Sequence, residues 1–316
     1  LIGNEQMISR WPARSGLLVQ DGRAYTTFGM WSPEGIVLTC LDAETGAVVW
    51  LDDSSGTRYT RVPHFPDMGG VSPQGYLALC GEVLVVTCGR AAPAFVDSRT
   101  GKLLFPYSDL GYFPGGAWTM TFGDLAFSPC EFLHKPNPER PAKPGSEADI
   151  SEQATLVAYR AQDGKEVFSL NGALKGVIDP NGRMSLIGPG KLIGIDVNDV
   201  LKVAPTSFKK LRTSSGHMVD AAKYKRWETP VDRVYQLVRA GSTLVAGSRG
   251  LLTCYDDEDG SKTWETPLKG DVRELLVADA SILASTTEGE IHCFQTGNPS
   301  ELQVTGPATG DIQIPA

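Results

Sequence analysis

Seven side chains within the first 120 residues are of types that bind anions or sugars. Guanidinium groups form paired hydrogen bonds to carboxylate or phosphate oxygens, and aromatic rings commonly form the walls of ligand pockets. The candidate ligand- or partner-binding residues are Trp31, Arg58, Arg61, His64, Arg90, Tyr112 and Trp118. The alternative interpretation needs no ligand: the arginines are solvated or paired with nearby aspartates, and the aromatic rings pack against their own loops.

The histidines and cysteines do not have the spacing of a metal site or a catalytic group. The sequence contains four histidines and six cysteines. No histidine lies at ligand spacing from another histidine or a cysteine, and there is no CxxC pair of the kind that binds zinc. No serine lies in a GxSxG context, which presents the nucleophile in many hydrolases. We therefore predict no metal site and no catalytic triad.

Charge and hydropathy exclude two further classes of function. The formal net charge is −8 and the basic residues are scattered, whereas a nucleic-acid groove requires clustered positive charge. No apolar run approaches the roughly 20 residues that cross a membrane as a helix. We therefore predict no nucleic-acid partner and no transmembrane segment. The chain begins Leu1-Ile2-Gly3, without an initiator methionine, and we expect it to be a piece of a longer protein.

A repeat of 39 residues indicates which elements position the candidate residues. The segment after Trp227-Glu228-Thr229-Pro230 is repeated after Trp264-Glu265-Thr266-Pro267, with short apolar runs and turns in the same order. Three pairs of residues share one spacing (283−244, 289−250 and 293−254, each 39), namely Leu244 and Leu283, Gly250 and Gly289, and Cys254 and Cys293. A period near 40 with several short strands per unit is typical of a β-propeller blade.

We therefore predict an all-β fold: a single β-propeller of four-stranded antiparallel blades. Earlier units are recognised by an apolar strand, an acidic turn, a glycine and a closing aromatic residue, at Trp50, Phe105 and Phe168. This count favours six blades, and seven or eight remain open. Trp11 precedes an apolar strand as Trp227 does. We expect residues 5 to 11 to form the fourth strand of the last blade, because this closes the ring and pairs both edges.

The turn between the third and fourth strands of a unit has a local physical basis. Aspartate accepts hydrogen bonds from backbone amides in such a turn, and glycine adopts a positive φ that other residues avoid. We therefore expect positive φ at Gly46, Gly101 and Gly260. The closing tryptophan or phenylalanine is expected to pack between neighbouring blades.

The unit after Phe168 is less regular than the others. Two apolar runs around a Gly-Pro-Gly turn, at residues 184–187 and 192–195, supply two of its strands. We expect Val197 to Val203 to form the third strand and Lys223 to Trp227 the fourth, with an irregular excursion at residues 204–222.

Three of the cysteines occupy equivalent positions in different units. Cys40, Cys254 and Cys293 each lie near the end of a third strand, so they are too far apart to form disulfides with one another. We expect all three to be small, buried core residues. A disulfide between Cys88 and Cys130 remains an alternative, if the loops after two neighbouring strands fold together.

The turn residues also carry a family resemblance. The pattern of an apolar strand, aspartate, two variable residues, Thr-Gly, three residues and tryptophan resembles the repeat of the quinoprotein, or PQQ-like, β-propellers. These include quinone-dependent alcohol dehydrogenases and the lipoprotein of the outer-membrane β-barrel assembly machinery. One unit matches in full and the others depart at one or more positions. The full match is Asp42, Thr45, Gly46 and Trp50, and the departures include Phe105 for tryptophan and Arg160 and Gln295 for aspartate.

The resemblance implies one propeller over residues 1–297, with residues 298–316 as a C-terminal tail or linker. It also implies an extracytoplasmic location, either periplasmic or at the cell surface. The quinone-dependent enzymes of the family use adjacent cysteines and a calcium site, and this sequence has no adjacent cysteine pair. We therefore predict no cofactor, neither pyrroloquinoline quinone nor calcium.

Two functions remain open. The first is a non-catalytic platform or module of a longer protein, which binds a protein partner or a covalently attached neighbouring domain. The second is a quinone-dependent oxidoreductase or another enzyme. In either case we expect the site on the loop face of blades 1–3, because these units carry the long insertions, including Ser128 to Gln153.

Overall fold

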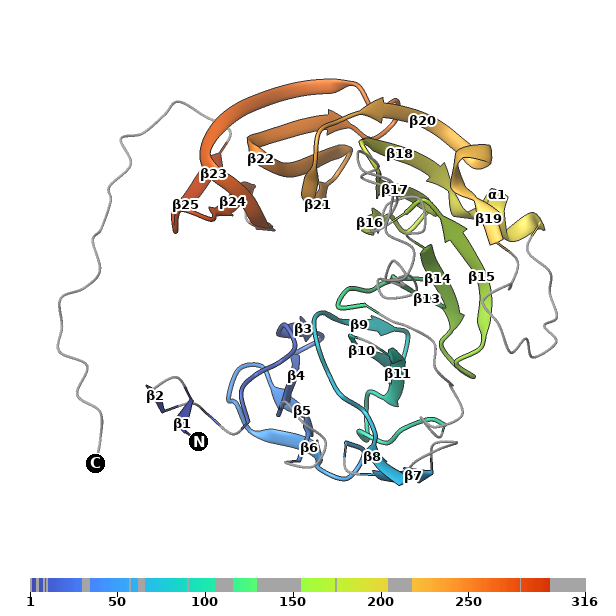
Figure 1. Cartoon of the computed structure of the whole chain (residues 1–316), viewed down its shortest axis with the longest axis vertical. Helices are drawn as coiled ribbons and strands as arrows, with labels where there is room; N and C mark the ends of the chain where they lie inside the picture. The colour runs from blue at the N-terminus through green and yellow to red at the C-terminus, as the bar shows by residue number, and fades with distance from the viewer. Residues whose placement is uncertain are drawn as a thin grey trace, which may run out of the picture.

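The computed structural model describes residues 2–3, 6–7, 9, 11–29, 35–56, 58–61, 66–89, 91–105, 116–129, 155–173, 175–203, 218–278 and 280–295. Sheets of these residues surround a central axis and leave an opening on one side (Figure 1). The fold is an all-β propeller, as predicted. No helix in these ranges is long and apolar enough to cross a membrane.

Five sheets of three to five strands form the blades. Blade 1 contains β3 (Leu18–Gln20), β4 (Arg23–Phe28), β5 (Val37–Asp42) and β6 (Val48–Asp52). Blade 2 contains β9 (Leu77–Cys80), β10 (Val83–Cys88) and β11 (Ala91–Asp97). Blade 3 contains β12 (Met120–Phe122), β13 (Leu125–Pro129), β14 (Thr155–Arg160) and β15 (Glu166–Asn171), with β19 (Met218–Asp220) parallel to β15.

Blade 4 contains β16 (Lys175–Ile178), β17 (Arg183–Gly188), β18 (Lys191–Asp196) and β20 (Lys225–Pro230). Blade 5 contains β21 (Val234–Ala240), β22 (Thr243–Asp256), β23 (Lys262–Ala278), β24 (Ser281–Thr286) and β25 (Ile291–Gln295). Both copies of the 39-residue repeat lie in blade 5, because the long strands β22 and β23 each pair with a different neighbour along their two halves.

Smaller elements lie outside the blade sheets. Two separate two-stranded sheets pair β1 (Ile2–Gly3) with β2 (Gln6–Met7), and β7 (Arg58–Arg61) with β8 (Pro66–Gly69). The chain also forms a short helix, α1 (Val197–Val203), and a 3-10 turn, η3 (Ala221–Tyr224).

The prediction of a third strand at Val197–Val203 is wrong. The third strand of blade 4 is β18, which pairs with both β17 and β20, and α1 follows it directly. The carboxylate of Asp196 accepts a hydrogen bond from the amide of Asn198 at 2.8 Å, and the amide of Val197 donates to the carbonyl of Gly182. These contacts turn the chain out of the sheet after Asp196. The predicted fourth strand is confirmed as β20.

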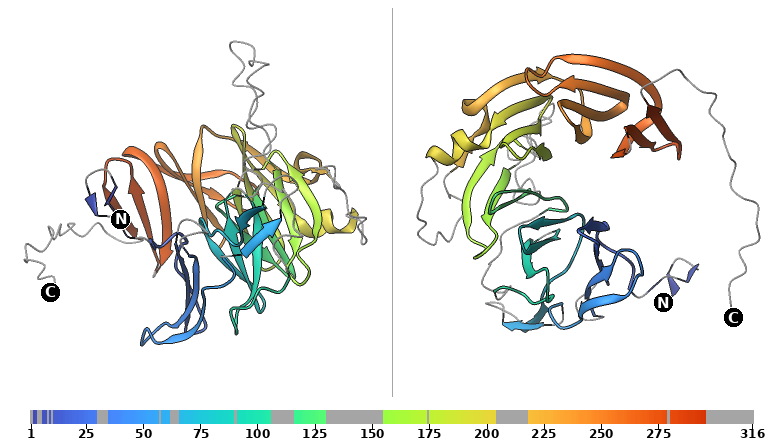
Figure 2. Two further views of the ribbon diagram at one scale, coloured as in Figure 1. Left: turned by 60° about the horizontal axis from the view of Figure 1, so that its bottom comes forward. Right: turned by 180° about the vertical axis from the view of Figure 1, so that it is seen from behind.

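The predicted closure of the ring by residues 5 to 11 is also wrong. Within the described residues of this stretch, Gln6 and Met7 pair with Gly3 and Ile2, and β25 is an outer strand of its sheet. A hairpin between neighbouring residues closes a very short loop, whereas pairing with β25 would close one of almost the whole chain. The opening between blade 1 and β25 is visible from both sides of the molecule (Figures 1 and 2).

The core lies between neighbouring blades. One cluster of buried side chains joins blades 1 and 2, a second joins blades 2 and 3, a third joins blades 3 and 4, and a fourth joins blade 4 to the first half of blade 5. A fifth cluster lies between the two halves of blade 5. Each sheet therefore depends on the next sheet to cover its apolar face, as in other repeat proteins.

A tryptophan and a glycine join the blades at two of these junctions. The indole N–H of Trp50 donates to the carbonyl of Ser98 at 2.8 Å, and that of Trp227 donates to the carbonyl of Asp257 at 2.9 Å. The ring lies directly over Gly101 or Gly260, so closely that a Cβ there would approach ring atoms to 2.5 or 2.4 Å. Only glycine can occupy these two positions without moving the ring.

The predicted conformation of these turns is confirmed. Gly46, Gly101 and Gly260 have φ of 73°, 76° and 72°. At the first of them, Asp42 accepts hydrogen bonds from the amide of Thr45 at 2.8 Å and from its hydroxyl at 2.7 Å. The predicted packing of the closing aromatic residue is also confirmed for Trp50, which is buried against blade 2.

Candidate interaction site

The residues predicted as a binding site lie mostly outside the described part of the chain. Arg58 and Arg61 are the end residues of β7, so their backbones form the two-stranded sheet after blade 1. Trp118 is partly buried and packs against the cluster between blades 3 and 4. The prediction that the seven side chains converge remains untested. The other four are outside the described ranges: Trp31, His64, Arg90 and Tyr112.

The side of blade 1 that faces away from blade 2 exposes a row of apolar side chains. Tyr25, Cys40 and Trp50 are cross-strand partners that pack toward blade 2. Because side chains alternate along a strand, their neighbours point to the opposite side of the sheet. We call this side the opening face of blade 1. Its exposed apolar residues are Val19 at 57%, Val49 at 43% and Leu51 at 54% exposure, together with Val48 at 62%, which pairs with Leu41 across a register shift in the sheet.

The end of blade 5 presents a similar surface. Leu275 and Ala284 pack into the cluster between the two halves of this blade. The next residues in the alternation, Leu276 and Leu283, are paired with each other and point the other way. We call this side the opening face of blade 5, and Leu276 is 56% and Ile291 75% exposed on it. Sequence reasoning missed both faces. Apolar residues on both sides of a strand are typical of a sheet that is covered on both faces, so the sequence did not indicate that one side is exposed.

Cys293 lies on the opening face of blade 5, which corrects the prediction that it is buried. It pairs with Leu283 across the sheet and is exposed, whereas its repeat equivalents Cys40 and Cys254 are buried. The difference arises because blade 2 covers Cys40 and the second half of blade 5 covers Cys254, whereas β25 is the outer strand of its sheet. The alternative disulfide involves Cys130, which lies outside the described residues.

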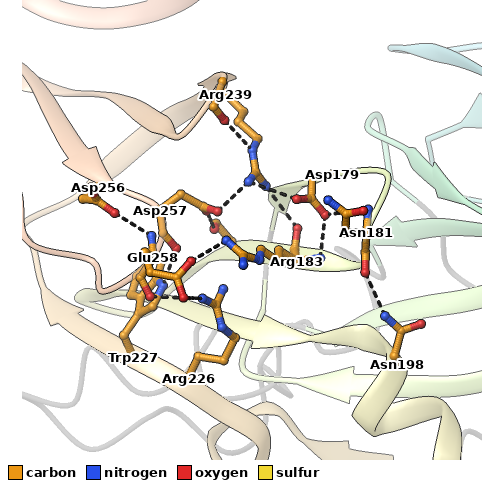
Figure 3. Close-up of polar contacts among 12 residues, drawn as sticks. Asp179, Asn181, Arg183, Asn198, Arg226, Trp227, Arg239, Asp256, Asp257 and Glu258 are labelled. Atoms are coloured by element: carbon orange, nitrogen blue, oxygen red, sulfur yellow. Dashed lines mark hydrogen bonds and ion pairs between the residues drawn. The ribbon is translucent and has the colours of Figure 1, made fainter.

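A buried polar cluster joins blades 4 and 5 (Figure 3). Arg239 pairs with Asp257 at 2.6 Å and with Asp179 at 3.2 Å. The hydroxyl of Ser185 donates to the second oxygen of Asp257 at 2.5 Å, and this carboxylate is 1% exposed. Both oxygens of Asp257 are therefore engaged within the protein. This cluster positions two blades and offers no free group for chemistry.

The same junction carries a second, exposed ion network. Glu258 accepts hydrogen bonds from Arg226 at 2.8 Å and from Arg183, so it joins two strands of blade 4 to the turn of blade 5 (Figure 3). Arg226 directly precedes Trp227, whose indole donates to Asp257 in the same turn. At this junction, therefore, the arginine of an Arg-Trp pair on blade 4 contacts Glu258 of blade 5. The tryptophan contacts the carbonyl of Asp257 and packs on Gly260.

Polar side chains connect blade 2 to blade 5 across the ring. The hydroxyl of Tyr76 donates to the carboxylate of Glu274 at 2.9 Å, and the amide of Gln236 lies 3.4 Å from both groups. Burial raises the pKa of Tyr76, and the neighbouring carboxylate raises it further. The phenol therefore remains protonated and acts as a hydrogen-bond donor at neutral pH. Sequence reasoning gave no signal for this contact, because its residues are 198 positions apart.

The described residues hold no group of three or more His, Cys, Asp or Glu side chains that could bind a metal ion. The one described histidine, His292, lies 3.1 Å from the carboxylate of Glu290 in its own hairpin. The polar groups described above are each engaged with other protein groups. The main unsatisfied surface is therefore apolar, on the two opening faces.

Comparisons with known proteins agree with this architecture. Residues 217–301 match the family model described as outer membrane protein assembly factor BamB. The matched segment contains blade 5 with its 39-residue repeat, so this part of the propeller is similar to the PQQ-like repeats of that family. No curated protein matches the sequence.

Two solved structures show the same fold at low sequence identity. The computationally designed Ika8 protein has a TM-score of 0.55 at 10% identity, over 90% of this chain and 70% of that chain. BamB from Moraxella catarrhalis has a TM-score of 0.50 at 14% identity, over 91% of this chain and 84% of that chain. At these identities the likeness concerns the fold alone.

Proposed function

We propose that this chain is a non-catalytic β-propeller that binds a protein partner, as a platform or as a module of a longer protein. The observation that carries the proposal is the pair of apolar opening faces. Contiguous exposed apolar side chains are rare on proteins that act alone, and they mark surfaces that another protein covers. Covering such a surface contributes roughly 25 cal/mol for each Å² of apolar area removed from water.

The polar groups support binding rather than catalysis. The buried carboxylate of Asp257 and the guanidinium of Arg239 are engaged with each other, and Tyr76 is a neutral donor to Glu274. A catalytic acid or base needs a free position within reach of a substrate. The description of the matching family model names an assembly factor of the outer membrane, which favours protein partners and an extracytoplasmic location.

Two finer features belong to the same proposal. The chain has six repeat units, because the second half of β23 with β24 and β25 forms a unit of its own beside the first half of blade 5. The chain also takes no cofactor. When the purified protein is supplied with pyrroloquinoline quinone and calcium, we expect no reduction of an electron-accepting dye by alcohols or sugars. Quinone-dependent reduction would instead support the oxidoreductase alternative.

Site-specific photo-crosslinking tests the platform function. A photoreactive amino acid is placed at Leu51 or Ile291 on the opening faces, and at Leu104, which is 41% exposed elsewhere, as the matched control. In the organism that produces the protein, we expect Leu51 and Ile291 to give an adduct with the same discrete protein. The Leu104 variant should not form it. Absence of adducts at both opening faces, or equal adducts at Leu104, would contradict the function.

A further inference from the structure

The turn of blade 1 repeats the device that receives a tryptophan at two junctions. Ala43 occupies the place of Ser98 and Asp257, and its amide donates to Gly22 as theirs donate to Glu82 and Ser242, each at 2.9 Å. Its carbonyl is therefore held in the position that accepts an indole N–H elsewhere. Gly46 has the same positive φ as Gly101 and Gly260.

Among the three turns that contain Gly46, Gly101 and Gly260, only the blade 1 turn leaves the indole position uncovered. A Cβ at Gly101 or Gly260 would strike a tryptophan ring, whereas no atom lies within 4 Å of the corresponding point at Gly46. The chain's own Trp11 lies elsewhere, with its indole nitrogen 3.4 Å from the Cβ position of Gly35, and is 49% exposed. Within the described residues, the glycine of blade 1 thus lacks the ring that explains the other two.

The blade 1 turn also carries an acidic side chain at the position that, in the blade 5 turn, pairs with an arginine. At the filled junction between blades 4 and 5, Arg226 pairs with Glu258 while Trp227 covers Gly260. Glu44 occupies the position of Glu258 in the blade 1 turn, and it is exposed. A strand that brings an indole to Ala43 and Gly46 would place the preceding side chain beside Glu44. A basic residue there would form an exposed pair, adding selectivity more than affinity.

We infer that the turn at Asp42–Gly46, together with the opening face of blade 1, is a docking site for a β-strand of a protein partner that carries an Arg-Trp pair. The indole stacks on Gly46 and its N–H donates to the carbonyl of Ala43. The arginine pairs with Glu44, and apolar side chains of the strand cover Val19 and Val48. This inference rests on the proposed platform function and specifies the chemistry of its partner.

The probe is a fluorescent peptide with the sequence of residues 223–230, which contains Arg226 and Trp227 in their natural context. Its binding to the full chain is measured by fluorescence anisotropy. We expect saturable binding that falls at least tenfold when Trp227 in the peptide is replaced with alanine. The variant Gly46→Val of the full chain should lose binding to the same extent, because the new side chain fills the indole position.

Two controls separate docking from loss of fold. Gly81→Val, at another positive-φ turn with open space around it, should bind the peptide like the unmodified chain. Glu44→Arg should weaken binding of the parent peptide, and a peptide with Arg226→Glu should restore it to that variant. Equal binding by the Gly46→Val chain, or no recovery after the charge exchange, would overturn the inference.

Two other outcomes have a defined meaning. If the peptide binds only to a Trp11→Ala variant, the chain's own Trp11 occupies the position and the partner inference is wrong. If the peptide fails to bind while the crosslinks at Leu51 and Ile291 form, the platform function stands and only the Arg-Trp chemistry is excluded. The two proposals can therefore fail separately.

Discussion

The absence of a side chain at glycine allows a tryptophan ring of the neighbouring blade to pack directly on the turn. Gly260 has positive φ and lies under the Trp227 ring, whereas Gly46 has the same φ in open space. Gly260→Val should cost about 2 to 5 kcal/mol, since strained backbone and steric overlap add together. Gly46→Val should cost only about 1 to 3 kcal/mol, from the backbone alone. Urea unfolding of both variants measures the difference, and equal losses would show that ring packing contributes nothing.

Asp42 provides a second prediction at this scale. Hydrogen bonds from the hydroxyl and amide of Thr45 lower its pKa below the ordinary value of 3.8. A lowered pKa means that the ionised form is favoured in the folded state, so this contribution is lost as the pH falls through the folded pKa. Thr45→Val should raise the pKa of Asp42, as measured by NMR titration. The pKa of Asp97 in the equivalent turn of blade 2 serves as the control and should not change.

The elements could be predicted from the sequence wherever local chemistry determines them. The Asp-to-Gly turns at Asp42, Asp97 and Asp256 were predictable because each closes its own hairpin with hydrogen bonds inside a few residues. Helix α1 was not, because its apolar residues suit a buried strand equally well. The pairing of residues 5 to 11 and the contact of Tyr76 with Glu274 depend on distant parts of the chain, which a repeat pattern does not specify.

The outer position of β25 leads to a prediction about thiols. Cys293 is exposed on this strand, while Cys254 is buried at the equivalent position of β22 and burial raises its pKa. A thiol reacts as the thiolate, so the native protein should contain a rapidly labelled thiol at Cys293 and a slow one at Cys254. In labelling with a disulfide reagent, the fast phase should be smaller by one thiol in Cys293→Ser and unchanged in Cys254→Ser. Slow labelling of Cys293 in the native protein would mean that β25 is covered in solution.

At the scale of the whole molecule, the loop face of blades 1–3 remains a second predicted surface. If it contributes to partner binding, Arg61→Ala and Arg90→Ala should weaken binding of the crosslinked partner several-fold. Arg249→Ala, within β22, and Glu288→Ala, in the turn before β25, should leave it unchanged. Pull-down of the identified partner by each purified variant measures this. If only the blade 5 variants weaken partner binding, the partner-binding surface lies on blade 5 and not on the loop face of blades 1–3.

Four buried clusters each join two adjacent sheets and the fifth joins the two halves of blade 5, so the described residues form no central core that all blades share. Duplication of a 39-residue unit next to the opening would create one new junction and leave the others unchanged. A gene that encodes such a chain can therefore lengthen or shorten by whole repeats with little penalty. Selection would then act on the number of units at the opening. Substitutions at the Trp-Gly junctions would be selected against whatever the number of units, namely at Trp50, Gly101, Trp227 and Gly260.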